Sequence, residues 1–156
     1  MVVLMFRTVI VFGCIFCANV SANDVYFNQA WLRETPQEHS SVAIYGRLIN
    51  ESQGFEFLES VTSEQANLVM LHRSVKQQGM IGMVHIESVQ IAPGETAYFE
   101  PAGLHMMAIG LRERPVQGDC LKLILQFRSG KEIKARAIVG SIAQMEFPRK
   151  KESCLE

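Results

Sequence analysis

The chain has 156 residues, of which 15 are Lys or Arg and 16 are Asp or Glu, so its formal net charge is −1 at pH 7. Because there is no basic excess, we expect it to bind neither nucleic acid nor an anionic lipid surface. The length fits one domain with a hydrophobic core of its own.

Residues 1–22 have the pattern of a secretory signal peptide. Arg7 precedes an apolar run that begins at Thr8, and two small residues end the segment, Ser21 and Ala22. This pattern predicts cleavage after Ala22 and a periplasmic location. A membrane anchor is the weaker alternative, because the run is shorter than the roughly 20 residues that span a bilayer. We therefore expect no stable membrane insertion of the mature protein.

Four cysteines divide between the signal peptide and the mature chain. Bulky phenylalanines lie close before Cys14 and Cys17 and argue against a lipidated cysteine. Cys120 and Cys154 remain after cleavage, and in an oxidising compartment they can form a disulfide. The sequence leaves two alternatives open, which are a buried Cys120 beside an unpaired Cys154, or a second soft metal site.

From residue 25 onward, short stretches alternate apolar and polar residues and are separated by Pro, Gly and Asn. This spacing is typical of the strands of a sandwich or barrel, and no long helical periodicity interrupts it. The pattern predicts nine strands: Val25–Leu32, Ser41–Ile49, Phe55–Leu58, Leu68–Leu71, Val84–Ile91, Thr96–Phe99, His105–Leu111, Leu121–Phe127 and Glu132–Val139.

Two connections have recognisable turn chemistry. Phe127–Glu132 contains Ser-Gly and predicts a tight hairpin turn. Thr62–Ala66 predicts a single helical turn, since Thr62 can cap it and Gln65 can reach back. The fold class predicted from these features is all-β, an antiparallel sandwich or barrel. It forms a single domain over residues 23–147, followed by a flexible charged tail over residues 148–156.

Two stretches of the mature chain combine histidine with methionine, His72–His85 and Gly103–Met107. On a strand, His105 and Met107 share one face, and Met106 points to the other. Neutral thioether and imidazole donors select copper(I) over hard cations. The alternative is a metal-free interaction module, because methionine is also ordinary core filler. We expect Met70 to pack inward, as Met106 does.

The spacing of four of these residues resembles a family motif. Ten residues separate His72 from Met83, twenty-one separate Met83 from His105, and one separates His105 from Met107. This is similar to the H-x10-M-x21-H-x-M motif of the periplasmic PCu(A)C copper-chaperone family. Further similarity covers residues 25–139: Ala30–Pro36, Ala43–Tyr45, Asn50, Gly79–Met83, Ala92–Gly94, Pro101–Met107, Gly110–Leu111, Gly118–Asp119 and Leu123–Phe127.

The resemblance implies a cupredoxin-like barrel that binds one copper(I) at an exposed rim, with His72, Met83, His105 and Met107 as ligands. It further implies delivery of copper to an acceptor protein, either a cytochrome c oxidase subunit that receives its binuclear copper centre or an assembly factor. A periplasmic role in copper storage or resistance is the alternative within the same chemistry. The chain departs from many relatives at Ala102–Leu104, where they have two glycines and a tyrosine.

Other residues near the motif have secondary roles in this interpretation. Met80 and His85 are possible auxiliary ligands. No His or Met follows Met145, so the tail lacks the His and Met donors with which some members of the family it resembles bind further copper. A blue-copper site is not expected, because Cys120 has no His or Met close after it. No nucleophile–base, phosphate-loop or H-E-x-x-H motif is present, so we do not expect an enzyme.

Overall fold

A computed structural model of the protein describes residues 24–36, 40–77 and 79–148. The structure over these residues consists of strands and turns, and contains no helix that is long and apolar enough to cross a membrane. The strands are β1 (Val25–Arg33), β2 (Ser41–Asn50), β3 (Glu56–Thr62), β4 (Ala66–Gln77), β5 (Met80–His85), β6 (Val89–Ile91), β7 (Thr96–Phe99), β8 (Leu104–Leu111), β9 (Cys120–Phe127) and β10 (Glu132–Gly140).

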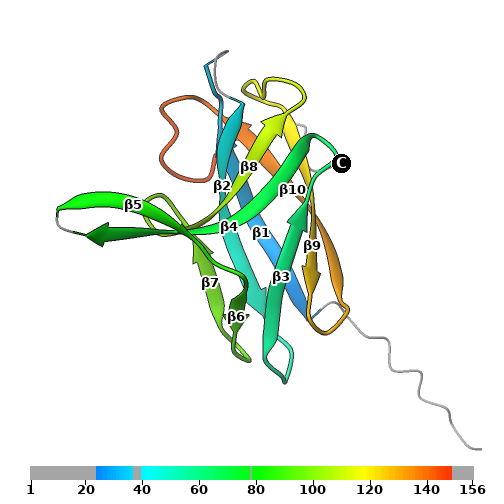
Figure 1. Ribbon diagram of the computed structural model, residues 1–156. Helices are drawn as coiled ribbons and strands as arrows, with labels where there is room; N and C mark the ends of the chain where they lie inside the picture. Colours follow the sequence, from blue (N-terminus) through cyan, green and yellow to red (C-terminus); the bar gives the residue numbers. More distant parts are fainter. Residues whose placement is uncertain (1–23, 37–39, 78, 149–156) are drawn as a thin grey trace, which may run out of the picture.

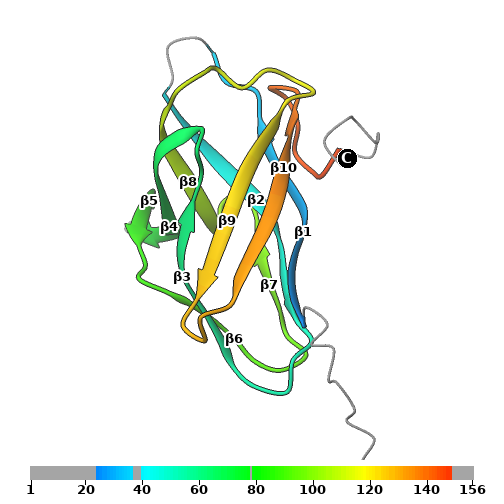
Figure 2. The ribbon, with the colours of Figure 1, turned by 90° about the vertical axis from the view of Figure 1, so that its right-hand side faces the viewer.

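The strands form one sheet that closes on itself. Hydrogen-bonded neighbours follow the order β5-β4-β8-β7-β2-β1-β10-β9-β3-β6, and β4 also pairs with β3. This last pairing closes a barrel, which Figure 1 and Figure 2 show from two sides. The predicted all-β fold is therefore confirmed. Two pairs of strands depart from the antiparallel pattern, because β1 runs parallel to β10 and β7 runs parallel to β8.

Alternating side chains build one continuous core inside the barrel. Along β9, Leu121, Leu123, Leu125 and Phe127 are buried, and the residues between them are more exposed. This is the period-two pattern of a strand with one face on a core. Met106 in β8 is fully buried, so the prediction that it packs inward is confirmed. The neighbours of Met106 along β8 consequently face away from the core.

Strands β4 and β5 continue beyond the barrel wall as a projecting hairpin, which lies at the left of Figure 1. Their pairing runs from His72 opposite His85 to Gln77 opposite Met80. All six residues of β5 are exposed, and β4 is its only neighbour in the described sheet. The predicted strand Leu68–Leu71 is therefore longer in the structure. It continues as β4 to Gln77 and forms one arm of the hairpin.

The prediction of one strand over Val84–Ile91 is wrong. Strand β5 ends at His85, and the next strand begins at Val89. The Ile86 N–H donates to the Leu71 carbonyl at 2.9 Å, which holds the chain against the barrel as it leaves the hairpin. The chain then crosses to pair with β3 as β6. The apolar pattern of Val84–Ile91 is continuous, but its first part pairs with β4 and its last part pairs with β3.

The prediction of a helical turn at Thr62–Ala66 is also wrong, since this segment is a simple turn between β3 and β4. The Gln65 side chain donates to the Cys120 carbonyl at 3.0 Å and accepts from the Lys122 N–H at 2.8 Å. These bonds to β9 replace the capping bond within a helix that Gln65 was expected to make.

The prediction of a hairpin turn at Phe127–Glu132 is confirmed. The Phe127 N–H donates to the Lys131 carbonyl and the Gly130 N–H donates to the Phe127 carbonyl, both at 2.9 Å. Gly130 has φ of 83°, which glycine adopts without steric cost.

The predictions for the disulfide, the signal peptide and the tail concern residues that the structure describes only in part. Cys120, at the start of β9, is disulfide-bonded. Cys154 lies outside the described residues, so its pairing with Cys120 stays a prediction. The signal peptide over residues 1–22 and all but the first residue of the tail over residues 148–156 also lie outside them.

Candidate metal centre

Three neighbouring strands each carry one histidine and one methionine two residues apart, so that the two side chains share a face. The pairs are Met70 and His72 on β4, Met83 and His85 on β5, and His105 and Met107 on β8. His72 pairs directly with His85 on one side and with His105 on the other. Three imidazoles therefore form a row across β5, β4 and β8.

The rings of this row stand edge to face. The ring centroids of His72 and His85 are 5.9 Å apart at an interplanar angle of 85°. Those of His72 and His105 are also 5.9 Å apart, at 83°. Leu71 and Met106 point into the core on the opposite face. The row consequently lies on the outer face of the barrel, at the base of the projecting hairpin.

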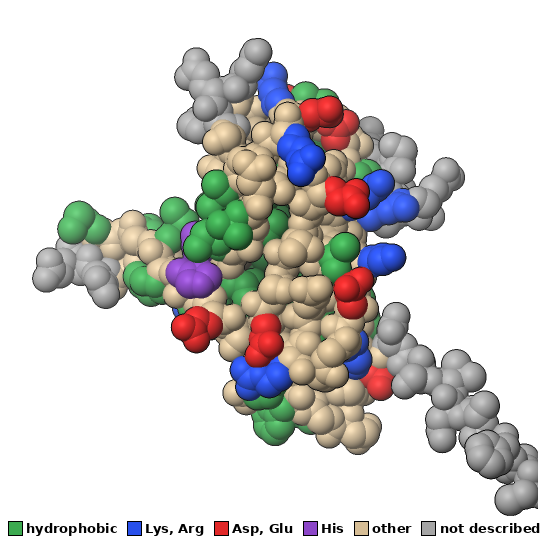
Figure 3. Space-filling model, turned by 45° about the vertical axis from the view of Figure 1, so that its right-hand side comes forward, with side chains coloured by type: hydrophobic (Ala, Val, Ile, Leu, Met, Phe, Trp, Pro, Cys, Tyr) green, Lys and Arg blue, Asp and Glu red, His purple; other side chains and the backbone are tan. Residues whose placement is uncertain are grey.

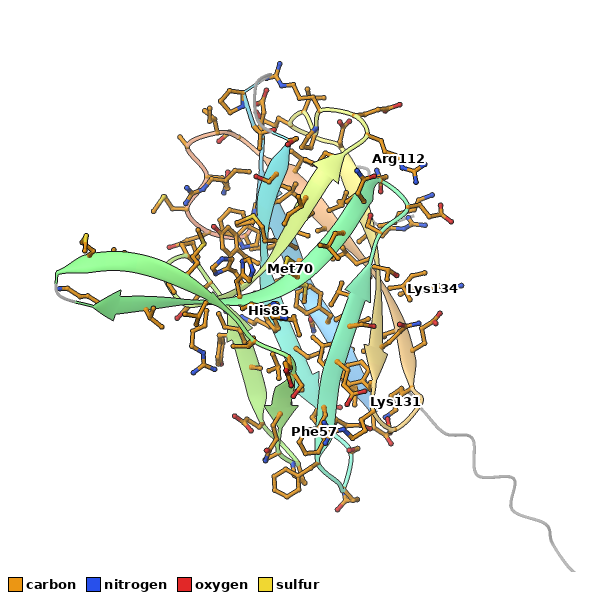
Figure 4. All side chains as sticks on the ribbon, viewed as in Figure 1. Phe57, Met70, His85, Arg112, Lys131 and Lys134 are labelled. Atoms are coloured by element: carbon orange, nitrogen blue, oxygen red, sulfur yellow. The ribbon has the colours of Figure 1, made fainter. Side chains whose placement is uncertain are left out.

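Met70 lies on this outer face, and the prediction that it packs inward is wrong. It is partly buried, and it stands directly opposite Met107, while the residue after it, Leu71, enters the core. Figure 4 labels Met70 and His85 close to each other where the hairpin leaves the barrel. The sequence signal that could have identified Met70 is its M-x-H spacing with His72. When this segment pairs antiparallel with the H-x-M segment of His105 and Met107, methionine faces methionine and histidine faces histidine.

The turn before β8 fixes the orientation of His105. This side chain is only 4% exposed, and its Nδ1 lies 3.1 Å from the Gly103 carbonyl oxygen. A carbonyl only accepts, so Nδ1 donates this hydrogen bond, and Nε2 is the ring nitrogen left for a metal ion. The same carbonyl accepts the Ser74 N–H at 3.0 Å, which ties the turn to β4. His105 is thus held in the tautomer that can bind a cation through Nε2.

His72, in the middle of the row, has an unsatisfied ring nitrogen. Its Nδ1 is buried and has no hydrogen-bond partner in the structure. Burial, and to a lesser degree the neighbouring His105 and His85, hold the pKa of His72 below its usual value. The ring is therefore neutral at pH 7. A bound cation would compensate the unsatisfied nitrogen, whose burial costs about 1–3 kcal/mol.

The four residues of the spacing motif are not equally close in the sheet. Three of them lie on the paired strands β4 and β8: His72 is on β4, and His105 and Met107 are two residues apart on β8. Met83 stands opposite Ser74 on the hairpin, diagonal to His72, and is 59% exposed. Met80 is three residues from Met83, so the pleat directs it to the other face of β5.

The surface around the row is apolar on the hairpin side. Figure 3 shows histidine side chains at the base of the hairpin, bordered by hydrophobic ones. Of the exposed hydrophobic residues of β5, Ile81 and Met83 alternate with the other face and lie on the same side as His85. In the described part of the chain, no group of three or more His, Cys, Asp or Glu side chains could hold a metal ion.

Comparison with known proteins assigns the chain to a family. The model of the family described as "Putative lipoprotein LpqE-like" matches residues 25–139. The chain belongs to the LpqE-like family. It is 27% identical over 110 residues to a "Putative lipoprotein Lxx21020" of Leifsonia xyli subsp. xyli, an alignment that covers 70% of this chain. The LpqE-like chain spans 65% of that relative's length.

Solved structures similar to this LpqE-like domain include PCuAC domains, so the predicted resemblance is confirmed for the fold. The apo PmoF2 PCuAC domain matches with a TM-score of 0.66 and 17% identity, over 79% of this chain and 94% of the other. The CuI-DR1885 structure from Deinococcus radiodurans matches with a TM-score of 0.55 and 22% identity, over 71% and 74%. At these identities the likeness establishes the cupredoxin-like barrel of the LpqE-like chain.

Proposed function

We propose that this LpqE-like protein binds one copper(I) ion on the outer face of β4, β5 and β8 and carries it to an acceptor protein. The observation that supports this most is the pairing of His72, whose Nδ1 is buried and unsatisfied, with His105, whose Nδ1 is hydrogen-bonded to the Gly103 carbonyl and leaves Nε2 as the nitrogen for a metal. The proposed ligands are His72, Met83, His105 and Met107. The copper-bound PCuAC domain from PmoF2 and CuI-DR1885, which share the fold, both contain copper.

The donor chemistry suits a carried ion better than a permanently held one. Imidazole and thioether are neutral donors, and soft sulfur favours copper(I) over hard cations. Thioethers neither release a proton on binding nor form disulfides in an oxidising compartment. Met83 is more than half exposed, so one side of the ion would be accessible to an acceptor with thiolate or imidazole ligands.

The acceptor and the compartment are the finer parts of this proposal. The acceptor that fits the family resemblance is the binuclear copper centre of cytochrome c oxidase or a factor that assembles it. We assign the protein a carrier role and no catalytic one, in line with a family and fold that are not those of an enzyme. Mixing the copper-loaded protein with the purified soluble copper domain of the oxidase tests the acceptor. Copper that stays on the LpqE-like protein would contradict it.

Copper(I) is expected to raise the midpoint of thermal unfolding, because it binds the native state alone. At a free copper(I) concentration about 100 times Kd, the stabilisation is about 2.7 kcal/mol. The measurement is a thermal melt under anaerobic conditions with and without copper(I), with His105→Ala as the variant that should be stabilised by no more than about 0.4 kcal/mol. An unchanged midpoint for the unmodified protein would favour the metal-free interaction module.

Export to the periplasm predicts a defined amino terminus. The exported protein is expected to begin at Asn23, after cleavage behind Ala22, as measured by intact mass. The names of the family and of the Leifsonia xyli relative include the word lipoprotein, which makes Cys14 and Cys17 the residues to examine. A mature form that begins at a lipidated Cys14 or Cys17 would overturn the predicted cleavage site.

A further inference from the structure

Strands β4 and β8 place four soft or borderline donors in two paired positions that follow each other on the outer face of the barrel. Met70 stands opposite Met107, and His72 stands opposite His105. Directly opposite residues of an antiparallel pair have Cβ atoms about 4.5–5.5 Å apart. Because all four alternate with core residues, they share the outer face. Two thioethers and two imidazoles thus form a two-by-two block.

Met83 occupies a different position relative to this block. It stands opposite Ser74 on the hairpin, whereas Met107 stands opposite Met70. Met83 and Met107 therefore lie two strands apart and four residues apart along β4, on either side of His72. Register places Met70 much nearer to Met107 than Met83 is. If Met70 is the fourth ligand, all four ligands lie on β4 and β8 in the barrel wall. If Met83 is the fourth ligand, the hairpin has to move toward the barrel.

We propose that Met70 is a further copper(I) ligand that exchanges with Met83. This inference rests on the proposed copper(I) binding and adds a second arrangement of the same site. In the barrel arrangement, Met70, His72, His105 and Met107 hold the ion. In the hairpin arrangement, Met83 replaces Met70, while the other three ligands remain bound.

The exchange is a balanced substitution. One copper–sulfur bond forms and another breaks, and both thioethers are neutral, so no proton or electron moves and the charge of the site is unchanged. Met70 is partly buried in the barrel wall, and Met83 is 59% exposed on the hairpin. The barrel arrangement therefore shields the ion, and the hairpin arrangement presents it to an acceptor.

The test uses the whole mature protein with Met70→Leu, Met83→Leu and the double variant. Leucine conserves the apolar volume and removes the sulfur. Met145→Leu is the matched control, because Met145 is an exposed methionine outside the three strands. X-ray absorption gives the number of sulfur donors per copper(I), and competition with a chromophoric chelator gives the affinity. Circular dichroism verifies that each variant is folded.

Each single variant is expected to keep two sulfurs per copper, since the remaining methionine joins Met107. The double variant is expected to keep one sulfur and to bind copper(I) about tenfold or more weaker than either single variant, in the non-additive manner of coupled residues. The inference is overturned if Met83→Leu alone leaves one sulfur, or if adding Met70→Leu to it changes neither sulfur count nor affinity. Absence of copper from the unmodified protein would instead refute the proposed function.

Discussion

Replacing His105 with alanine is expected to weaken copper(I) binding by about 100-fold or more. Mutation of a group that merely supports a metal ligand costs about 10- to 100-fold in affinity, and His105 is proposed to be a ligand itself. Its ring is almost fully buried and oriented by the Gly103 carbonyl, so no other donor can occupy its place without rearranging the turn. Anaerobic competition with a chromophoric copper(I) chelator measures the loss.

Two further variants make this result interpretable. His72→Ala removes a less buried ring from the same pair and is expected to cause a loss of similar size. His39→Ala is the matched control, because His39 is a histidine that is not among the proposed ligands. If His105→Ala and His72→Ala both bind copper(I) as tightly as the unmodified protein while remaining folded, the histidine pair is not the site.

Replacing Asn50 with alanine is expected to lower the free energy of unfolding by about 2–4 kcal/mol. Asn50 is fully buried at the end of β2. Its Nδ2 donates to the carbonyls of Gly54 at 2.8 Å and Ile91 at 3.0 Å, and its Oδ1 accepts from the N–H and the hydroxyl of Ser52. Alanine removes all four bonds, of which the bond to the Ile91 carbonyl is buried, and leaves space where the amide was. The midpoint of thermal unfolding should fall by roughly 8–16 °C.

An exposed asparagine on a neighbouring strand provides the comparison. Asn28→Ala on β1 is expected to change the free energy of unfolding by less than about 0.5 kcal/mol. Urea unfolding of the two variants under the same conditions gives both values. Equal stabilities for Asn50→Ala and Asn28→Ala would show that the buried network at Asn50 contributes little to the barrel.

The sequence pattern predicts the strands well and their partners poorly. The alternation along Leu121–Phe127 and Thr96–Phe99 is local, and the structure has strands at both places. The break between His85 and Val89 has no local signal, because it arises where one chain segment leaves β4 and pairs with β3. The role of Gln65 likewise depends on β9, which lies more than 50 residues further along the chain.

The candidate site shows the same division. Alternation on a strand is enough to place His105 and Met107 on one face, and the structure has them there. It is not enough to place Met70 opposite Met107 or His85 opposite His72, because these contacts depend on the register of three strands. A shift of one residue would send every side chain of a strand to the other face. The disulfide partner of Cys120 and the signal peptide stay predictions.

The most direct test of copper(I) binding by imidazole and thioether is X-ray absorption on the mature protein loaded with copper under reducing, anaerobic conditions. The expected result is one copper(I) per chain, coordinated by two nitrogen donors and two sulfur donors. Both sulfurs should remain when either Met70 or Met83 is replaced by leucine, one should remain when both are replaced, and none when Met107 is replaced as well. A copper environment made only of nitrogen and oxygen, or a protein that retains no copper(I), would contradict it.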